Sequence, residues 1–496
     1  MLVPLTFIDK AADGVGLSCC FVFQLPTATN EGERDELVDS IRQAAIRVVK
    51  KWPLLGGKPE WTRGGLAIRI SESSDKQPNS RLGFSTITYD KPFHEAAGLS
   101  LPLPPLTSTP SAVYPVSDIS FFRPSSVPRR LLGHWLFDKP LLHVHVSLFR
   151  DAVAVGVSVP HGVLDGTGVG ILVRALDAEL RGRTWDAPPL PNDDGNPLPA
   201  ALDNLEADHT VSQQASKLSN RRLLQCWAPM SFLGMLALLT SMIWEQILGQ
   251  SQARRAFLTD ETLGRLASEV KGQVKDDTDG REFVSTGDVL VAWFLKTVHA
   301  DEVNTRDQVH ASAAYSARWL LDSHSPSPLS LYPSNLLFLY DLFPRPIPLS
   351  FLPTAPLATL ARSSRGQLTL SRSLPVVSAV SRWMRNSRRL IPVRDSPFRL
   401  TNRPRAYRWF FSNHTALGLA DLSLPHPSAA AADANNEQVV LPLSYFFFAG
   451  VGPVDPDHVI TFQKVPGGVN VSGNMRKSRW EALARSIEAL EAEGAA

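Results

Sequence analysis

"VSVPHGVLDGTGVG" (residues 157–170) is the stretch that decides the fold class of this chain, because two local patterns meet in it. Up to residue 160, valines alternate with other residues as in a buried strand. From Gly166 onward the apolar side chains recur at helical spacing, on Val169, Leu172, Val173, Leu176 and Leu180. His161 and Asp165 therefore lie at a predicted strand-to-helix junction, where a rigid backbone presents side chains to a cleft.

The rest of the chain shows the same mixture of strands and helices. Residues 141–149 and 152–159 alternate and are joined by two residues, which predicts a hairpin whose second strand ends at His161. A helix is predicted at 34–51, with one apolar face formed by Leu37, Ile41, Ala44, Ala45, Val48 and Val49. Further helices are predicted at 284–298, with Ser285 or Thr286 as N-cap, and from about Ser478. Further strands are predicted in "PLSYFFFAG" and "HVITF". This pattern is typical of an α/β protein.

Length and composition exclude several classes of function. The 496 residues suffice for two to four domains, and 50 basic against 48 acidic residues lack the basic excess of a nucleic-acid-binding protein. Three cysteines (Cys19, Cys20, Cys226) form neither a disulfide framework nor a CxxC metal site. Because no basic and apolar leader begins the sequence, we expect a cytoplasmic protein. No P-loop or GxGxxG motif occurs, so neither nucleotide hydrolysis nor a nicotinamide cofactor is expected.

His161 has the setting of a general base. Such a base presents a neutral imidazole nitrogen to a substrate proton, and the glycine that follows His161 does not crowd its approach. Asp165 can close the turn or pair with a distant arginine, and Gly166 leaves room for a substrate. The spacing alone favours the plainer interpretation, in which His161 ends a strand and Asp165 caps a helix, because HxxxD arises easily by chance.

The stretch "PHGVLDGTG" resembles the HxxxDG signature of the BAHD superfamily of acyl-CoA-dependent acyltransferases. Further pieces match in the order of that family and cover nearly the whole chain: "PLTFIDK", "WPLLGGK", "STGDVLVAW", and "AYSARWLLD" followed by "LYPSNLLF". The resemblance implies two similar chloramphenicol-acetyltransferase-like α/β domains, with mixed sheets flanked by helices and a central solvent channel. We expect these domains at 1–190 and 222–496, joined by a crossover linker at 191–221.

The resemblance also implies a division of roles. His161 would deprotonate the acceptor, whose oxygen then attacks the thioester of acyl-CoA without a covalent acyl-enzyme. Asp165 would be structural and would pair with Arg318, the arginine of "AYSARW". No metal is expected, and acyl-CoA, most simply acetyl-CoA, would be a co-substrate rather than a permanent cofactor.

The second family signature, DFGWG, is missing. The aligned segment is "FSNHTALGLADLSLP", in which Ser423, Leu424 and Pro425 replace Asp, Phe and Gly, and His414 replaces a tryptophan. An oxyanion or CoA-side contact is expected from Ser412 or Asn413, although the altered signature does not identify which.

We therefore expect an O-acyltransferase that esterifies a hydroxyl of an apolar secondary metabolite, such as a terpenoid or polyketide, and acts as a monomer. The proline-rich inserts and the apolar segment 227–244 favour the fungal branch of the family. Two alternatives stay open: a carrier-protein-dependent condensation enzyme, which typically has a second histidine where this chain has Pro160, and a non-catalytic protein that binds acyl-CoA or the metabolite.

Three weaker signals leave alternatives open. Residues 227–244 carry no charge; a single membrane crossing there would separate His161 from Arg318, which leaves a peripheral membrane contact or a buried or partner-facing helix. Residues 382–408 hold nine arginines, which suit CoA phosphates, anionic lipid or a solvated surface. His143 and His145 have HxH spacing, which more often reflects packing than a metal site.

Overall fold

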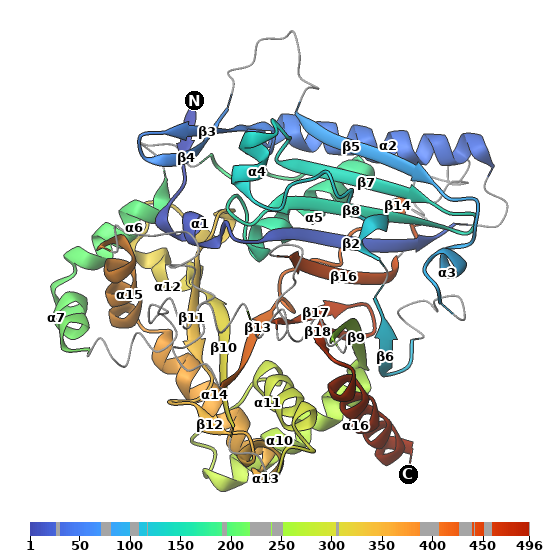
Figure 1. Cartoon of the computed structure of the whole chain (residues 1–496). Coiled ribbons are helices and arrows are strands. Elements are labelled where there is room, and N and C mark those ends of the chain that lie inside the picture. The colour runs from blue at the N-terminus through green and yellow to red at the C-terminus, as the bar shows by residue number, and fades with distance from the viewer. Residues whose placement is uncertain are drawn as a thin grey trace.

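The computed structural model places the chain in two layered halves, each built on a β-sheet (Figure 1). It describes all residues except 26–29, 71–80, 100–108, 117, 191–195, 219–239, 241–250, 304–306, 387–405, 426–438, 441, 451–458 and 496. The apolar segment 227–244, apart from Thr240, lies outside the described residues. No helix among the described residues is long and apolar enough to cross a membrane.

The first sheet contains the hairpin predicted from the sequence. Its strands run in the order β16 (Pro442–Gly450), β2 (Gly16–Gln24), β8 (Ala152–Pro160), β7 (Leu142–Leu148) and β5 (Leu82–Thr88). Only β5 and β7 are parallel, so the sheet is mixed. Because β8 is central, every side chain along it is buried and its end is held rigidly.

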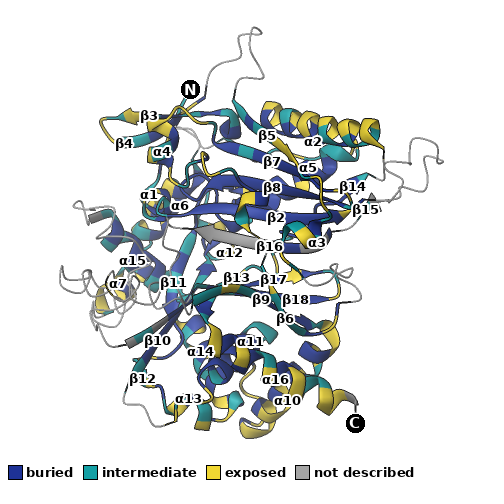
Figure 2. Cartoon of the chain, turned by 45° about the vertical axis from the view of Figure 1, so that its right-hand side comes forward, coloured by how far each residue is buried: buried dark blue, intermediate teal, exposed yellow. Residues whose placement is uncertain are grey.

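Two helices pack together over this sheet, α2 (Glu31–Lys51) and α5 (Gly166–Leu180). The six side chains predicted on the apolar face of residues 34–51 are the buried ones of α2: Leu37, Ile41, Ala44, Ala45, Val48 and Val49. Asn30 caps the helix with a capping box to Glu33. Figure 2 shows the opposite face of α2 exposed along its length, as amphipathic patterning requires.

The second sheet is larger and also mixed. Its strands run in the order β11 (Leu337–Asp341), β10 (Gln308–Ser316), β13 (Ala406–Asn413), β17 (Val459–Val465), β18 (Gly468–Arg476), β9 (Ser251–Thr259) and β6 (Ala112–Pro115), with β12 (Ile347–Pro348) also on β10. The pairs β10–β13 and β13–β17 are parallel. Its helices are α10 (Asp260–Asp277), α11 (Thr286–Val298), α14 (Leu357–Ser371) and α16 (Lys477–Ala495). Ser285 caps α11, as one of the two predicted candidates.

Each sheet includes one strand from the other half of the sequence. β16, from near the C-terminus, pairs with β2 in the first sheet, and β6, from the N-terminal half, pairs with β9 in the second. Figure 1 shows both exchanges as strands whose colour differs from that of their neighbours. The division at residues 190 and 222 stays a prediction, but no single cut separates the two sheets.

The crossover is more ordered than its composition suggests. Residues 186–221 lack evident periodicity, yet α6 (Pro197–Ala207) and α7 (His209–Lys217) form within them. The assignment of residues 191–221 as a crossover linker stays a prediction. Prolines and polar capping residues interrupt the segment and make its short apolar repeat hard to recognise. The side chains of this repeat are buried on α6: Leu198, Ala201, Leu202 and Leu205. Both helices contact α15 (Leu374–Asn386).

Shorter elements complete the part of the first half that surrounds the junction. They are β1 (Leu2–Pro4), α1 (Phe7–Ala12), β3 (Lys58–Thr62), β4 (Gly65–Arg69) and α4 (Leu131–Leu136), with β1, β4 and β3 forming a small sheet. In the second half, α12 (Arg318–Leu321) follows β10 directly, and β14 (Leu424–Pro425) lies against α5.

Candidate active site

His161 follows the last residue of β8 and is fixed by both halves of the molecule. Its backbone N–H donates to the carbonyl of Val15 at 2.9 Å, and its own carbonyl accepts a hydrogen bond from Asn335 Nδ2 at 2.7 Å. Only 8% of the residue is exposed. A histidine held at a strand end by neighbours from both halves is therefore placed at the contact between the two sheets.

The protonation state of His161 follows from its burial. Burial lowers its pKa below the ordinary imidazole value, and its own backbone carbonyl and the charge of Asp165 offset this effect only in part. The imidazole is therefore neutral at pH 7, which is the state that can accept a proton.

Asp165 is the N-cap of α5 and is fully buried. Its Oδ1 accepts hydrogen bonds from the backbone N–H of Thr167 at 2.9 Å and of Gly168 at 3.1 Å. Its Oδ2 pairs with Arg318 Nη2 at 2.8 Å and accepts the N–H of Leu336 at 3.3 Å. These donors occupy the acceptor positions of the carboxylate, so its contacts are those of a structural group.

Arg318 connects this carboxylate to the loop that follows α12. Its Nε and Nη2 donate to the carbonyl of Tyr332 at 3.0 and 2.9 Å, and Nη2 also donates to the carbonyl of Ser334 at 2.8 Å. Nη1 donates to Ser316 Oγ at 3.0 Å. The guanidinium thus holds residues 332–334 against the N-terminus of α5.

Two further buried residues, Asp9 and Asn335, belong to this cluster, and neither was predicted from the sequence. Asn335 donates to Asp9 Oδ1 through its backbone N–H and through Nδ2, both at 2.9 Å, while Nδ2 also reaches the carbonyl of His161. Burial raises the pKa of Asp9 although Thr6 and Asn335 hydrogen-bond to it. Both residues lie in segments that carry the family resemblance, but 326 residues separate them, so no local pattern links them.

Glycines let the second half approach the start of α5 closely. A Cβ at Gly168 would overlap the carbonyl oxygen of Pro333, and one at Gly170 would overlap that of Leu417. At Gly166, a Cβ would lie 2.8 Å from Leu417 Cδ1. The lack of a Cβ at Gly166 therefore leaves room for Leu417, whereas room for a substrate there stays a prediction.

Ser412 and His414 form a neutral pair beside His161. Ser412, near the end of β13, lies 2.6 Å from His414 Nε2 through its Oγ. The His414 ring also approaches Gly166, 3.6 Å from where a Cβ would be. Burial, together with the neighbouring His161, lowers the pKa of His414 to about 3. The structure thus brings the position that lacks the family tryptophan to the HxxxDG motif.

Asn413 makes a local contact, whereas Ser423 of the altered signature contacts α5. Asn413 Oδ1 accepts hydrogen bonds from the backbone N–H and the hydroxyl of Thr415 at 3.0 and 2.7 Å. Ser423 is buried; its backbone N–H donates to Asp177 Oδ1 at 2.9 Å and its Oγ accepts from Arg181 Nε at 3.0 Å. Ser423 therefore fastens the C-terminal segment to the end of α5.

The two histidines of the HxH pattern and two of the nine arginines make ordinary contacts within the fold. Ser85 Oγ bridges His143 Nε2 at 2.9 Å and His145 Nδ1 at 2.7 Å, and within the described ranges no three His, Cys, Asp or Glu side chains are placed to hold a metal. Of the nine arginines, Arg385 pairs with Asp203 on α6 at 2.6 Å, and Arg382 donates to Ser212 on α7 at 3.4 Å. Residues 387–405 lie outside the described residues.

Comparisons with known proteins bear out the resemblance, although no protein-family model matches. The chain is 24% identical over 306 residues to the acetyltransferase BOT5 of Botryotinia fuckeliana, covering 60% of this chain and 53% of that protein. It is 28% identical over 273 residues to the O-acetyltransferase PaAT-2 of Phomopsis amygdali, covering 53% and 52%. The matched region thus spans about half the length of these curated relatives.

Solved structures share the fold over nearly the whole chain. TRI101 of F. sporotrichioides, complexed with coenzyme A and T-2, matches with a TM-score of 0.63 at 16% identity, covering 97% and 96% of the two chains. Vinorine synthase matches with a TM-score of 0.55 at 15% identity, covering 98% and 92%, and the first condensation domain of the CDA synthetase with 0.54 at 14%, covering 100% and 97%. The predicted two-domain fold with mixed, helix-flanked sheets is confirmed.

Proposed function

We propose that this BAHD-like chain is an acyl-CoA-dependent O-acyltransferase, and that it esterifies a hydroxyl of an apolar secondary metabolite such as a terpenoid or polyketide. The observation that carries the proposal is a neutral, buried histidine that both halves of the molecule fix at their contact. The acetyltransferase names of its fungal relatives support acetyl-CoA as the donor.

The proposed reaction uses His161 as general base. The imidazole takes the proton of the acceptor hydroxyl, and the oxygen attacks the carbonyl carbon of the thioester. The resulting tetrahedral intermediate collapses to the ester as the C–S bond breaks. The leaving CoA thiolate then takes the proton back from the imidazolium, so that the enzyme is regenerated without a covalent intermediate.

Ser412 is the side chain that we assign to the oxyanion of this intermediate. If His414 Nε2 donates to Ser412 Oγ across their 2.6 Å contact, the serine hydroxyl proton is left to donate toward the site. The low pKa of His414 keeps the pair uncharged. Asn413 stays the second candidate: its Oδ1 accepts from Thr415, so only its Nδ2, which lies near Gly287, could donate.

The test is a mass-spectrometric assay of ester formation from a panel of acyl-CoA donors and apolar alcohols. His161→Ala should lower kcat by about 10² to 10⁴ while CoA binding, measured by calorimetry, persists. The matched control is His209→Ala, on the exposed face of α7, which should turn over like the wild type. A His161→Ala variant with near-wild-type turnover would refute the assignment.

The same assay discriminates the two alternatives. A condensation enzyme shares the fold but would acylate only from a carrier protein, so turnover with free acyl-CoA contradicts it. A non-catalytic binding protein would bind CoA in the calorimeter and yield no ester with any donor in the panel while His161 is intact.

A further inference from the structure

An exposed apolar patch covers the outer side of α4 and the neighbouring strand β3. We call it the α4–β3 patch and define it by Trp61, Leu132, Trp135, Leu136 and Phe137, which are 59%, 42%, 37%, 59% and 68% exposed. It holds five of the twelve exposed large hydrophobic side chains among the described residues. Scattered single exposures are ordinary, whereas a contiguous cluster marks a contact surface.

The patch arises from the two faces of α4. Leu131 and His134 point inward and are buried, whereas the residues between and after them face solvent. The rings of Trp61 and Trp135 lie 5.9 Å apart, so the strand and the helix contribute to one continuous surface. Figure 1 shows α4 beside β3 and β4 at one end of the first sheet.

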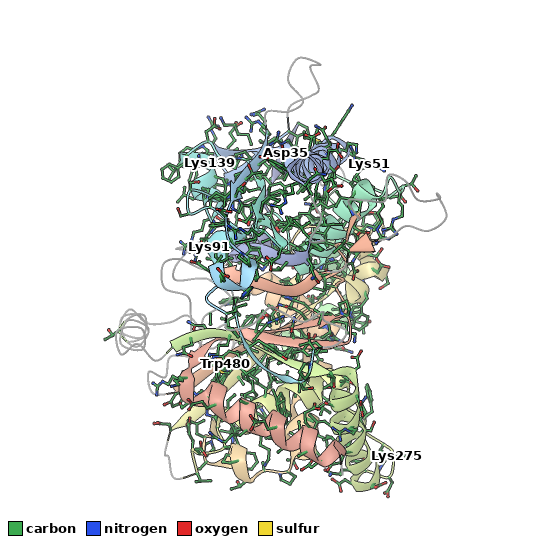
Figure 3. All side chains as sticks on the ribbon, turned by 90° about the vertical axis from the view of Figure 1, so that its right-hand side faces the viewer. Asp35, Lys51, Lys91, Lys139, Lys275 and Trp480 are labelled. Atoms are coloured by element: carbon green, nitrogen blue, oxygen red, sulfur yellow. The ribbon has the colours of Figure 1, made fainter. Side chains whose placement is uncertain are left out.

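The two segments that form the patch carry an excess of basic side chains. Residues 58–69 and 128–140 contain six lysines and arginines against two acids, and both acids are paired locally: Asp138 pairs with Lys58 at 2.7 Å, and Glu60 pairs with Arg69. The exposed cations include Arg63 and Lys139, and Figure 3 places Lys139 at the outer edge of the first half, on the side opposite Lys51. Exposed aromatic and aliphatic side chains in segments with excess positive charge are complementary to an anionic lipid surface.

The inner face of α4 touches the turn that follows His161. Leu131 Cδ1 would lie 2.7 Å from a Cβ at Gly162, and the backbone N–H of Leu131 donates to Asp13 Oδ1 at 2.8 Å. One short helix thus separates the patch from the candidate base. If the α4–β3 patch bound a lipid bilayer, the candidate site would lie close to the membrane in which an apolar substrate dissolves.

We propose that the α4–β3 patch is a docking surface for an anionic lipid bilayer, with Trp61, Trp135 and Phe137 at interfacial depth and the exposed cations of the two segments against the headgroups. This surface is distinct from the segment 227–244. The proposal goes beyond the acyltransferase activity and does not depend on it, because lipid binding can be measured without turnover.

The experiment is co-sedimentation of the full chain with vesicles of phosphatidylcholine alone and of phosphatidylcholine mixed with phosphatidylserine. The test variant is Leu136→Asp/Phe137→Asp, at two exposed positions where folding tolerates charge. The matched control, Phe283→Asp/Leu370→Asp, changes residues of equal exposure, 69% and 61%, in the second half. Circular dichroism establishes that both variants fold.

We expect the wild type and the control to sediment with the phosphatidylserine vesicles, and the test variant to lose about tenfold or more of this binding. High salt should weaken the wild-type binding. The proposal is overturned if the wild type binds neither kind of vesicle or if the test variant binds like the control. It is also overturned if sedimentation velocity shows a dimer that the test variant abolishes, because a second copy of the chain would then cover the patch.

Discussion

The ion pair between Asp165 and Arg318 predicts a specific pattern of stability losses. Asp165→Asn keeps an acceptor for the helix cap but removes the charge that faces the buried guanidinium. Removing one partner of a buried pair costs about 3 to 5 kcal/mol, and since Arg318 retains the carbonyls of Tyr332 and Ser334, we expect about 3 kcal/mol. Asp165→Ala also removes the acceptor for Thr167 and Gly168, which adds about 1 kcal/mol.

Urea unfolding followed by tryptophan fluorescence measures these losses, and a double-mutant cycle isolates the pair. Arg318→Met leaves Asp165 with its backbone donors but removes the donors to the carbonyls of Tyr332 and Ser334, so its expected cost is also about 3 kcal/mol. The coupling energy from the double variant should be about 2 kcal/mol. The matched control is Asp90→Asn, which breaks the exposed pair with Arg150 and should leave stability unchanged.

Two results would refute this reasoning. One is additivity of Asp165→Asn and Arg318→Met to within about 0.5 kcal/mol, which would show that the pair stabilises nothing. The other is a loss of turnover for Asp165→Asn comparable to that of His161→Ala, without a loss of stability. Asp165 would then act in the chemistry rather than in the architecture.

Four further predictions follow from individual contacts. Because burial lowers the pKa of His161, kcat/KM should stay level from pH 8 to 6.5 and decline only in more acidic solution; an inflection above pH 7 contradicts this. Burial raises the pKa of Asp13 to about 7, so the wild type loses stability as pH rises from 4 to 7. Asp13→Asn should therefore gain about 4 kcal/mol at pH 8 and nothing at pH 4 in urea unfolding. In the ester assay, Ser412→Ala should lower kcat by about 10²-fold with KM nearly constant, and Ser412→Thr should restore kcat. A Ser412→Thr variant no more active than Ser412→Ala would contradict a donating hydroxyl. Gly170→Ala, which meets a backbone carbonyl, should cost about 3 kcal/mol in urea unfolding, whereas Gly264→Ala, which meets nothing within 4 Å, should stabilise by about 0.5 kcal/mol; equal effects would contradict the close packing of α5.

Local periodicity predicted the elements around the junction well. The hairpin of β7 and β8, the apolar face of α2 and the cap at Ser285 depend on neighbours in sequence, and all three are confirmed. The helices of the crossover were missed because prolines and polar caps interrupt a repeat of only four apolar residues.

The candidate site was only partly predictable for a different reason. His161 and Asp165 share one motif, but their side-chain partners Asn335 and Arg318 come from a distant part of the chain, and Asn335 is itself bound by Asp9. The family resemblance identified Arg318. Asp9 and Asn335 lie in segments that carry the resemblance, but their contact could not be predicted, since a buried acid and a buried amide are paired only by the fold.

The exchange of β16 and β6 between the sheets also limits the order in which the sheets can form during synthesis. β2 can pair with β16 only after the ribosome has synthesised residues 442–450. The β2 edge of the first sheet is therefore open while most of the chain is synthesised. Open edges are sites of intermolecular pairing, and long-range strand pairing is slow. Expression of residues 1–190 alone is therefore expected to yield aggregates, whereas adding the segment 442–450 in trans should restore solubility by completing the sheet.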